Sequence, residues 1–309
     1  MARSKNVELR ASRPADSAEH DFALLLDTVR GIRWPARSAV RGGIPGAHNS
    51  RLRGTSAEFT EYRPYRQGDD LARMDWKLFA RSDRAYIRLS NDRAILPTTV
   101  VLDASGSMAY PVATEAKWKL AAQIAIGLAA VARNSADPVG LVIAHATGPV
   151  QLPPRTRQSV IHEMVRAVNE TGPGGDAPMS PSLTAATRFS GRVVVITDFL
   201  GDAEDLLAIA SRSVVGAREI HAVHIVAPEE LDPSRETLLV ADPEQPDVRR
   251  PMTSDARSQY LAAFSAWRED LAHVWSDAGV SYTIGVAGAE TPDHLIRRIT
   301  APRGVAASA

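Results

Sequence analysis

Two aspartates that each end an apolar run are the residues of this sequence best placed to do chemistry. Asp103 closes the run TTVVLD and Asp198 closes GRVVVITD. Ser105 and Ser107 follow Asp103 at two-residue intervals, and Gly106 between them lets the chain turn tightly. Carboxylate and hydroxyl oxygens are hard ligands that suit Mg²⁺ or Mn²⁺ better than zinc. We therefore predict that Asp103, Ser105, Ser107 and Asp198 hold a divalent metal ion.

A simpler interpretation of the turn stays open. Asp and Ser side chains at many strand-to-helix turns only cap the following helix and accept hydrogen bonds from the turn's N–H groups. Residues Asp103 to Ser107 could do the same without binding an ion.

The elements that must position these residues alternate between strands and helices after Pro97. Helix-length segments between strands require crossover connections, so we expect a doubly wound, mostly parallel α/β sheet with helices on both faces. The clearest strands span Thr98 to Asp103, Pro138 to His145, Gly191 to Asp198 and Glu219 to Val226, and a brief GPVQL run makes an edge strand.

The common strand order 3-2-1-4-5-6, with GPVQL counted third, would put Asp103 and Asp198 side by side at the carboxyl edge of the sheet. Two carboxylates about 4 Å apart repel by about 4 kcal/mol at an effective dielectric near 20. We therefore expect a cation between them.

Composition excludes several classes of protein. The chain has 309 residues, ordinary apolar and charged content, and no cysteine, which excludes disulfide scaffolds, thiolate zinc sites and cysteine nucleophiles. The smooth apolar stretch Leu120 to Ala132 is shorter than the ~20 residues of a membrane span. The polar N-terminus lacks the apolar core of a secretory signal. We expect a cytoplasmic protein without a membrane span.

The composition shifts along the chain and suggests its organisation. We expect a disordered tail, a basic β-containing module, an α/β domain with a Pro-rich insertion, and a second tail. These segments cover residues 1–20, 21–97, 98–301 with the insertion at 228–253, and 302–309.

Charge divides the chain in the same way. Residues 1–93 hold 18 Lys/Arg and 12 Asp/Glu, whereas residues 94–309 hold 18 and 24. The stretch from Arg33 to Arg66 is rich in arginine; a solvated face is the default interpretation, and it is also the best place for an acidic partner. Nucleic-acid binding through this stretch is an alternative, but the zero net charge of the whole chain does not favour it.

Two motifs resemble known families. The DxSxS turn, followed by a later strand-end Asp, is similar to the metal-ion-dependent adhesion site of von Willebrand factor type A domains. The segment Arg63 to Arg88 resembles the signature of the bacterial domain-of-unknown-function family number fifty-eight. Together the motifs cover roughly residues 40 to 200. The signature matches at Tyr65, Gly68, Asp69, Asp75, Trp76, Ala80 and Arg81.

The resemblance implies a fold of the von Willebrand factor A type and a non-catalytic, metal-assisted protein-binding module. In such a site an acidic side chain of the partner takes an open position on the metal. The resemblance also implies a partner, an AAA+ ATPase of the MoxR type. Related sites usually add a Thr from a third loop, and here Ala177 stands in its place. The adjacent Asp176 could turn inward, or a water could substitute.

An enzyme is the competing hypothesis. A sheet with strand-end aspartates and Mg²⁺ can also support phosphoryl transfer. However, Ser105 stands where such phosphatases usually place a second acid. The TGPGG segment lacks the GK(S/T) residues that would complete a P-loop. Ser105 also does not lie in the G-x-S-x-G sequence of a nucleophile elbow. We therefore expect no catalytic activity.

The charged signature has a structural interpretation as well. We expect its acids and arginines to form an ion-pair network that stabilises the basic module, and Trp76 to anchor a small core. The residues concerned are Asp69, Asp70 and Asp75 with Arg66, Arg73 and Arg81.

Overall fold

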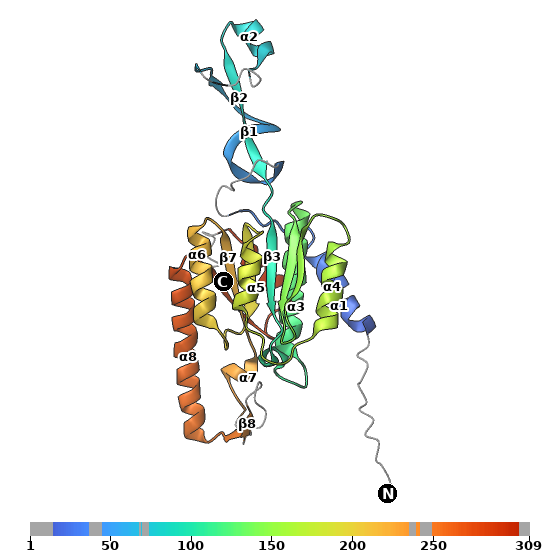
Figure 1. Ribbon diagram of the computed structural model, residues 1–309, viewed down its shortest axis with the longest axis vertical. Coiled ribbons are helices and arrows are strands. Elements are labelled where there is room, and N and C mark those ends of the chain that lie inside the picture. Colours follow the sequence, from blue (N-terminus) through green and yellow to red (C-terminus); the bar gives the residue numbers. More distant parts are fainter. Residues whose placement is uncertain are drawn as a thin grey trace.

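A computed structural model describes residues 15–36, 45–67, 69, 74–234, 239–241 and 249–302. The chain forms a helix-covered sheet, here called the body, and a projecting two-stranded arm (Figure 1). The arm consists of β1 (Pro45–Pro64), the short helix α2 (Trp76–Ser82) and β2 (Tyr86–Ala94).

The body is built on a six-stranded sheet with the order β10-β7-β6-β3-β4-β5. All neighbouring pairs are parallel except β4 and β5, which are antiparallel. Numbered within the body, this is the predicted 3-2-1-4-5-6 order, and the predicted doubly wound α/β fold is confirmed. The strands are β3 (Thr98–Asp103), β4 (Val139–Ala144), β5 (Val150–Arg155), β6 (Arg192–Thr197), β7 (Glu219–Val226) and β10 (Ser281–Val286).

The central strands are continuous apolar runs because both of their faces are covered. Every residue of β3 is buried, and its side chains alternate between two hydrophobic clusters. Val100 and Leu102 enter one cluster, whereas Val101 enters the other. Helices α1 (Ala15–Thr28), α3 (Ala116–Asn134), α4 (Val160–Thr171) and α9 (Pro292–Thr300) cover the first face, and α5 (Ser180–Thr187), α6 (Ala203–Val215) and α8 (Ser254–Asp277) cover the second.

Helix α1 belongs to the body and not to the module at 21–97 in which the sequence analysis placed it. Phe22, Leu25 and Val29 are buried in the same cluster as α3 and α9. Trp34 is buried in the same cluster, with the Arg192 guanidinium 4.1 Å from its ring centre. The helix also begins at Ala15, inside the segment expected to be a tail, whereas residues 1–14 lie outside the described part of the chain.

The edge strand β5 approaches β4 closely and contains Pro153 and Pro154. A Cβ on Gly140 of β4 would lie 2.8 Å from the Leu152 carbonyl oxygen, so only glycine fits there.

The segment between β7 and α8 contains short regular elements where a Pro-rich insertion was expected. These are α7 (Pro228–Leu231), β8 (Leu239–Ala241) and β9 (Arg249–Pro251). No helix of the described residues is both long enough and apolar enough to cross a membrane.

The arm leaves the body at the amino-terminal edge of the sheet, because β2 leads into the start of β3 (Figure 1). At its far end, the Asp75 carboxylate caps α2 by accepting the Leu78 N–H at 2.9 Å, and it also accepts the Tyr62 hydroxyl at 2.7 Å. Asp69 accepts the Arg63 guanidinium at 2.8 Å and the Arg66 N–H at 2.8 Å. Asp69 and Asp75 therefore stabilise the arm through hydrogen bonds within it.

Two expectations for the arm need correction. Trp76 is 57% exposed, so it does not anchor a core. The ion pair of Asp69 uses the side chain of Arg63, whereas Arg66 contributes its backbone N–H. Asp70 and Arg73 lie outside the described residues.

Candidate functional site

Asp103 lies at the carboxyl edge of the sheet, where β3 ends beside β6. One of its oxygens accepts the Ser105 N–H at 2.8 Å, and the other accepts the Thr197 hydroxyl at 2.5 Å. Burial of this carboxyl group and the nearby charge of Asp198 raise the pKa of Asp103 to about 7, although the two hydrogen bonds favour its ionised form. The carboxylate is therefore held in an environment that lacks sufficient positive charge.

The hydroxyls of Ser105 and Ser107 are hydrogen-bonded to each other, with their oxygens 3.1 Å apart, and both side chains are buried. They flank the start of a short 3-10 helix (Gly106–Ala109), which Ser105 precedes without capping it through its side chain. Neighbouring ligands of an octahedral Mg²⁺ are separated by about 3 Å when each bond is about 2.1 Å. The spacing of the two hydroxyls is compatible with a hard divalent cation, but the hydrogen bond between them accounts for it without an ion. The Ser105 N–H donates to Asp103, as the simpler interpretation of the turn expects.

The third loop, which the family resemblance implies, is hydrogen-bonded to this turn. The Gly174 N–H donates to the Ala104 carbonyl at 2.9 Å, and the Gly106 N–H donates to the Gly175 carbonyl at 2.8 Å. Ala177 on the same loop is buried, whereas Asp176 is exposed. The structure therefore gives no support to an inward turn of Asp176.

The cation beside Asp198 is a lysine. The Lys117 ammonium donates to Asp198 at 2.7 Å and to Glu230 of α7 at 2.9 Å. Burial lowers the pKa of Lys117, but the two carboxylates outweigh burial and raise it. The second oxygen of Asp198 accepts the Leu200 N–H at 3.1 Å. Asp198 thus already has a positive partner from within the chain.

Sequence reasoning missed Lys117, although a signal for it exists. Its position continues the apolar face of α3 by one turn, three residues before Leu120 and seven before Ile124. A lysine in register with a buried face predicts a buried carboxylate as its partner.

The donors present fit a divalent ion. Among the described residues, Lys117 is the only cationic side chain bonded to the acids of this site; it pairs with Asp198 and Glu230, whereas Asp103 accepts only the Ser105 N–H and the Thr197 hydroxyl. The described chain contains no group of three or more His, Cys, Asp or Glu side chains that could hold a metal, so an ion at this edge would need the serine hydroxyls as well. Asp103, Ser105 and Ser107 supply that oxygen set, and Asp198 is shared with Lys117.

Aromatic side chains pack around Phe199, the residue after Asp198, on the second face of the sheet. Phe199 packs edge-on against His224 and Trp275, at ring-centre distances of 5.4 and 4.9 Å. His224 is buried and hydrogen-bonded to the Tyr282 hydroxyl, and burial lowers the pKa of His224 to about 3. His224 is therefore neutral at physiological pH.

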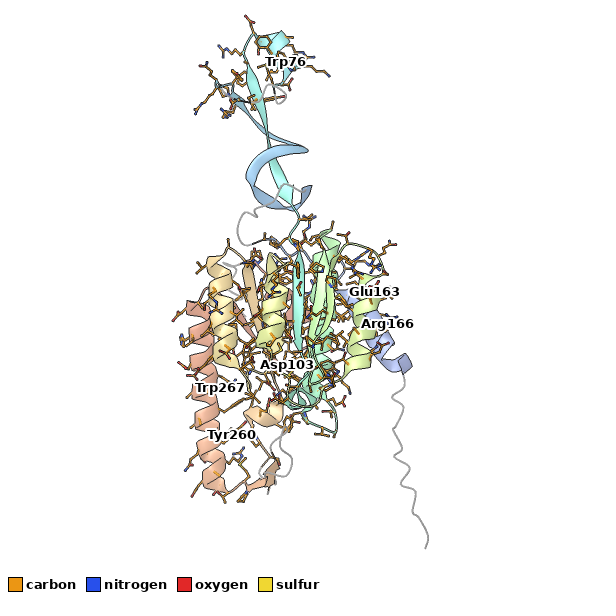
Figure 2. The ribbon with its side chains drawn as sticks, in the orientation of Figure 1. Trp76, Asp103, Glu163, Arg166, Tyr260 and Trp267 are labelled. Carbon is orange, nitrogen blue, oxygen red and sulfur yellow. The ribbon has the colours of Figure 1, made fainter. Side chains whose placement is uncertain are left out.

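Helix α8 extends past the carboxyl edge of the sheet and is hydrogen-bonded to α7. Figure 2 shows Tyr260 and Trp267 on α8 at the end of the body where Asp103 lies. The Tyr260 hydroxyl donates to the Glu230 carbonyl at 2.9 Å. Helices α7 and α8 thus border the candidate site and are connected to it through Glu230 and Lys117.

Comparison with known proteins gives one family and several distant structures. A model of the family described as "Protein of unknown function DUF58" matches residues 61–270. Uncharacterized proteins of Mycobacterium bovis and Mycobacterium tuberculosis are each 28% identical over 280 residues, which cover 87% of this chain and 84% of the relative.

The similar solved structures share low sequence identity with the chain. BatB, a conserved hypothetical protein of Bacteroides thetaiotaomicron, is 16% identical; the match covers 66% of this chain and 97% of BatB, with a TM-score of 0.42. The SpRpn10 VWA domain is 15% identical, with 69% and 100% coverage and a TM-score of 0.41. The manganese-loaded TRAP protein of Plasmodium vivax is 15% identical, with 42% and 57% coverage and a TM-score of 0.34.

Proposed function

The chain belongs to the DUF58 family of proteins of unknown function, and from that premise we propose that it is a non-catalytic, metal-assisted protein-binding module. The binding site is the carboxyl edge of the sheet around Asp103. The observation that carries the proposal is the pair of buried hydroxyls, Ser105 and Ser107, 3.1 Å apart beside a buried carboxylate.

Asp103, Ser105 and Ser107 would hold Mg²⁺ or Mn²⁺. When bound, such an ion supplies a coordination position that a carboxylate can occupy, because hard cations prefer oxygen ligands. Lys117 holds Asp198 and Glu230 on the other side of the site. The residues of the chain therefore fix one wall of the site and leave the partner to supply an acidic side chain.

The arrangement favours binding over phosphoryl transfer. A general acid or base must be free to reach the reacting atoms. Asp198 is bound by Lys117, and His224 is buried, neutral and bonded to Tyr282. Ser105 occupies the position where the alternative reaction needs a second acid.

The sequence resemblance and the chemistry of the site together support the proposed partner. The resemblance suggests an AAA+ ATPase of the MoxR type, and the site suggests that this partner presents an exposed Asp or Glu. The proposal places both proteins in the cytoplasm, the location expected from the sequence.

Titration calorimetry with Mn²⁺ tests the metal part of the proposal. We expect heat of binding from the wild type, at least tenfold weaker binding for Ser105→Ala, and unchanged binding for Ser258→Ala, an exposed serine on α8. Absence of heat from the wild type would remove the metal from the proposal.

Capture of a purified MoxR-type ATPase tests the partner. Binding in Mg²⁺ that EDTA reverses supports a metal-assisted contact. Binding that persists in EDTA would mean that the ATPase docks elsewhere, and no binding in Mg²⁺ would contradict this partner.

A further inference from the structure

The far end of the arm, here called the tip, contains a helix with no buried residue of its own, although Ile87 on the adjacent strand is buried. The tip comprises the described residues between Tyr62 and Ile87. None of the seven residues of α2 is buried, and Trp76 and Phe79 are 57% and 36% exposed on neighbouring turns. A helix this short is not stable in isolation and normally gains its stability from a packed apolar face. The exposed aromatic face of α2 is therefore suited to packing against another surface.

The tip also carries unpaired positive charge. Its acids Asp69 and Asp75 are occupied by hydrogen bonds within the arm. Within the described part of the tip, no ion pair involves the exposed cations, and Asp83 is the one other described acid. These exposed cations are Arg66, Lys77, Arg81 and Arg84.

The outer face of α8 has the complementary character. Ala262 and Ala266 are exposed there and leave a shallow apolar strip. Exposed acids lie along the same stripe of the helix, whose 3.6-residue period brings them to one side. We call this face the acidic stripe; its acids are Asp255, Glu269, Asp270 and Asp277.

The tip does not meet the acidic stripe of its own chain. Figure 1 shows the arm beyond the amino-terminal edge of the body, whereas α8 runs down the side of the body and past the opposite edge. The nine residues of β2 span about 30 Å, and the 24 residues of α8 span about 36 Å. The arm is therefore long enough to lie along the α8 of a second, antiparallel copy.

We propose that the chain forms a two-fold dimer in which the tip of each copy docks on the acidic stripe of the other. Trp76 and Phe79 pack on the strip at Ala262 and Ala266, and the tip cations face the acids of the stripe. A two-fold axis makes the contact twice and closes the assembly, so no filament results. The separation of basic and acidic residues into the two parts of the sequence supports a partner of the same chain.

A protein surface fits the tip better than a membrane or a nucleic acid. Exposed Trp and Arg are the residue types that dominate protein interfaces. Anionic membranes and nucleic acids attract clusters of basic residues, whereas the tip mixes its cations with Asp83 and two internally bound acids.

Sedimentation equilibrium of the purified full chain tests the dimer. We expect the apparent molecular mass to rise from that of a monomer to that of a dimer as the protein concentration increases. Added salt should lower this mass, because it screens the exposed charges. Trp76→Ala should weaken the dimer at least about tenfold. Leu24→Ala is the matched control, because Leu24 is an exposed apolar residue on α1 in the body and should leave the dimer unchanged.

A charge exchange identifies the two surfaces. The tip variant Lys77→Glu/Arg81→Glu and the stripe variant Glu269→Lys/Asp270→Lys should each be monomeric, because like charges then face each other. An equimolar mixture should dimerise, since each tip then meets a stripe of opposite charge. All four positions are exposed, so the fold is not at risk.

A monomeric wild type at all concentrations, or a mixture that fails to associate, would overturn the proposal. A monomer that binds phosphatidylglycerol vesicles through Trp76 would overturn it in favour of a membrane. EDTA should leave the dimer intact, so this result is separable from the metal-assisted binding proposed above.

Discussion

The ammonium of Lys117 lies 2.7 Å from a carboxylate oxygen of Asp198, and solvent reaches almost none of either side chain. Helix α3 therefore delivers one positive charge to the carboxyl edge of the sheet. Asp103 receives no such partner among the described residues, and its pKa rises to about 7 because of burial and the nearby Asp198. The two strand-end aspartates thus differ: Lys117 neutralises Asp198, whereas no cationic side chain of the described residues pairs with Asp103.

Lys117→Met should destabilise the protein by about 3–5 kcal/mol, because removal of one partner leaves buried carboxylates unpaired. Urea unfolding measures the loss. Lys119→Met is the control: Lys119 is exposed on the same helix, and its change should stay within about 0.5 kcal/mol. Mg²⁺ should stabilise Lys117→Met more than the wild type, because Asp198 is then free to bind the ion. Equal loss in both variants would contradict a structural role for the Lys117 pair.

Ala177→Thr should tighten Mn²⁺ binding about tenfold, the effect of roughly one added polar contact. The third loop is hydrogen-bonded to the turn at Ala104 and Gly106, so a hydroxyl at position 177 is added beside the site. Ala177→Val adds the same volume without a hydroxyl and should not tighten binding. Calorimetry compares the two. If valine and threonine behave alike, the loop does not supply the missing ligand.

Trp34→Ala and Trp76→Ala should differ sharply in their effect on stability. Trp34 is buried against Arg192, and its truncation should cost about 3–5 kcal/mol. Trp76 is exposed on α2, and its truncation should cost less than about 0.5 kcal/mol. Thermal unfolding at low protein concentration measures both. A small loss for Trp34→Ala would mean that the chain segment after α1 is not part of the body.

The unfolding free energy should fall as the pH drops from about 6.5 towards 3, in part because of His224. Burial lowers the pKa of folded His224 to about 3, so the unfolded chain takes up a proton first and gains stability relative to the folded state. His224→Asn should make this slope shallower by up to about 1.4 kcal/mol per pH unit. His162→Asn, which replaces an exposed histidine on α4, is the matched control. Parallel curves for the wild type and His224→Asn would contradict the lowered pKa.

Local patterns predicted the sheet and one half of the site. Continuous β-branched runs separated by helices leave few alternatives to a parallel sheet. The strand order was assumed from the commonest doubly wound arrangement, and the structure has that order, which places Asp103 at the carboxyl edge. The contact between Ser105 and Ser107 was predictable because both residues lie in a single turn.

The features that the sequence analysis missed depend on distant contacts. Lys117 meets carboxylates that lie 81 and 113 residues further along the chain. The packing of Trp34 depends on Arg192, on a strand far from it in sequence. The exposure of Trp76 was not predictable either, because a signature that mixes charged and aromatic residues is equally compatible with a small core.

The prolines of β5 have a consequence for how the molecule can assemble. Neighbouring residues of a strand direct their N–H groups to opposite sides, so Pro153 and Pro154 together remove a donor from the open rim of the sheet. A strand of another chain therefore cannot pair with the exposed edge of β5 through a complete set of backbone hydrogen bonds. Edge-to-edge association of sheets and amyloid-like growth are thereby discouraged at β5. Any recognition at this edge must use side chains and loops.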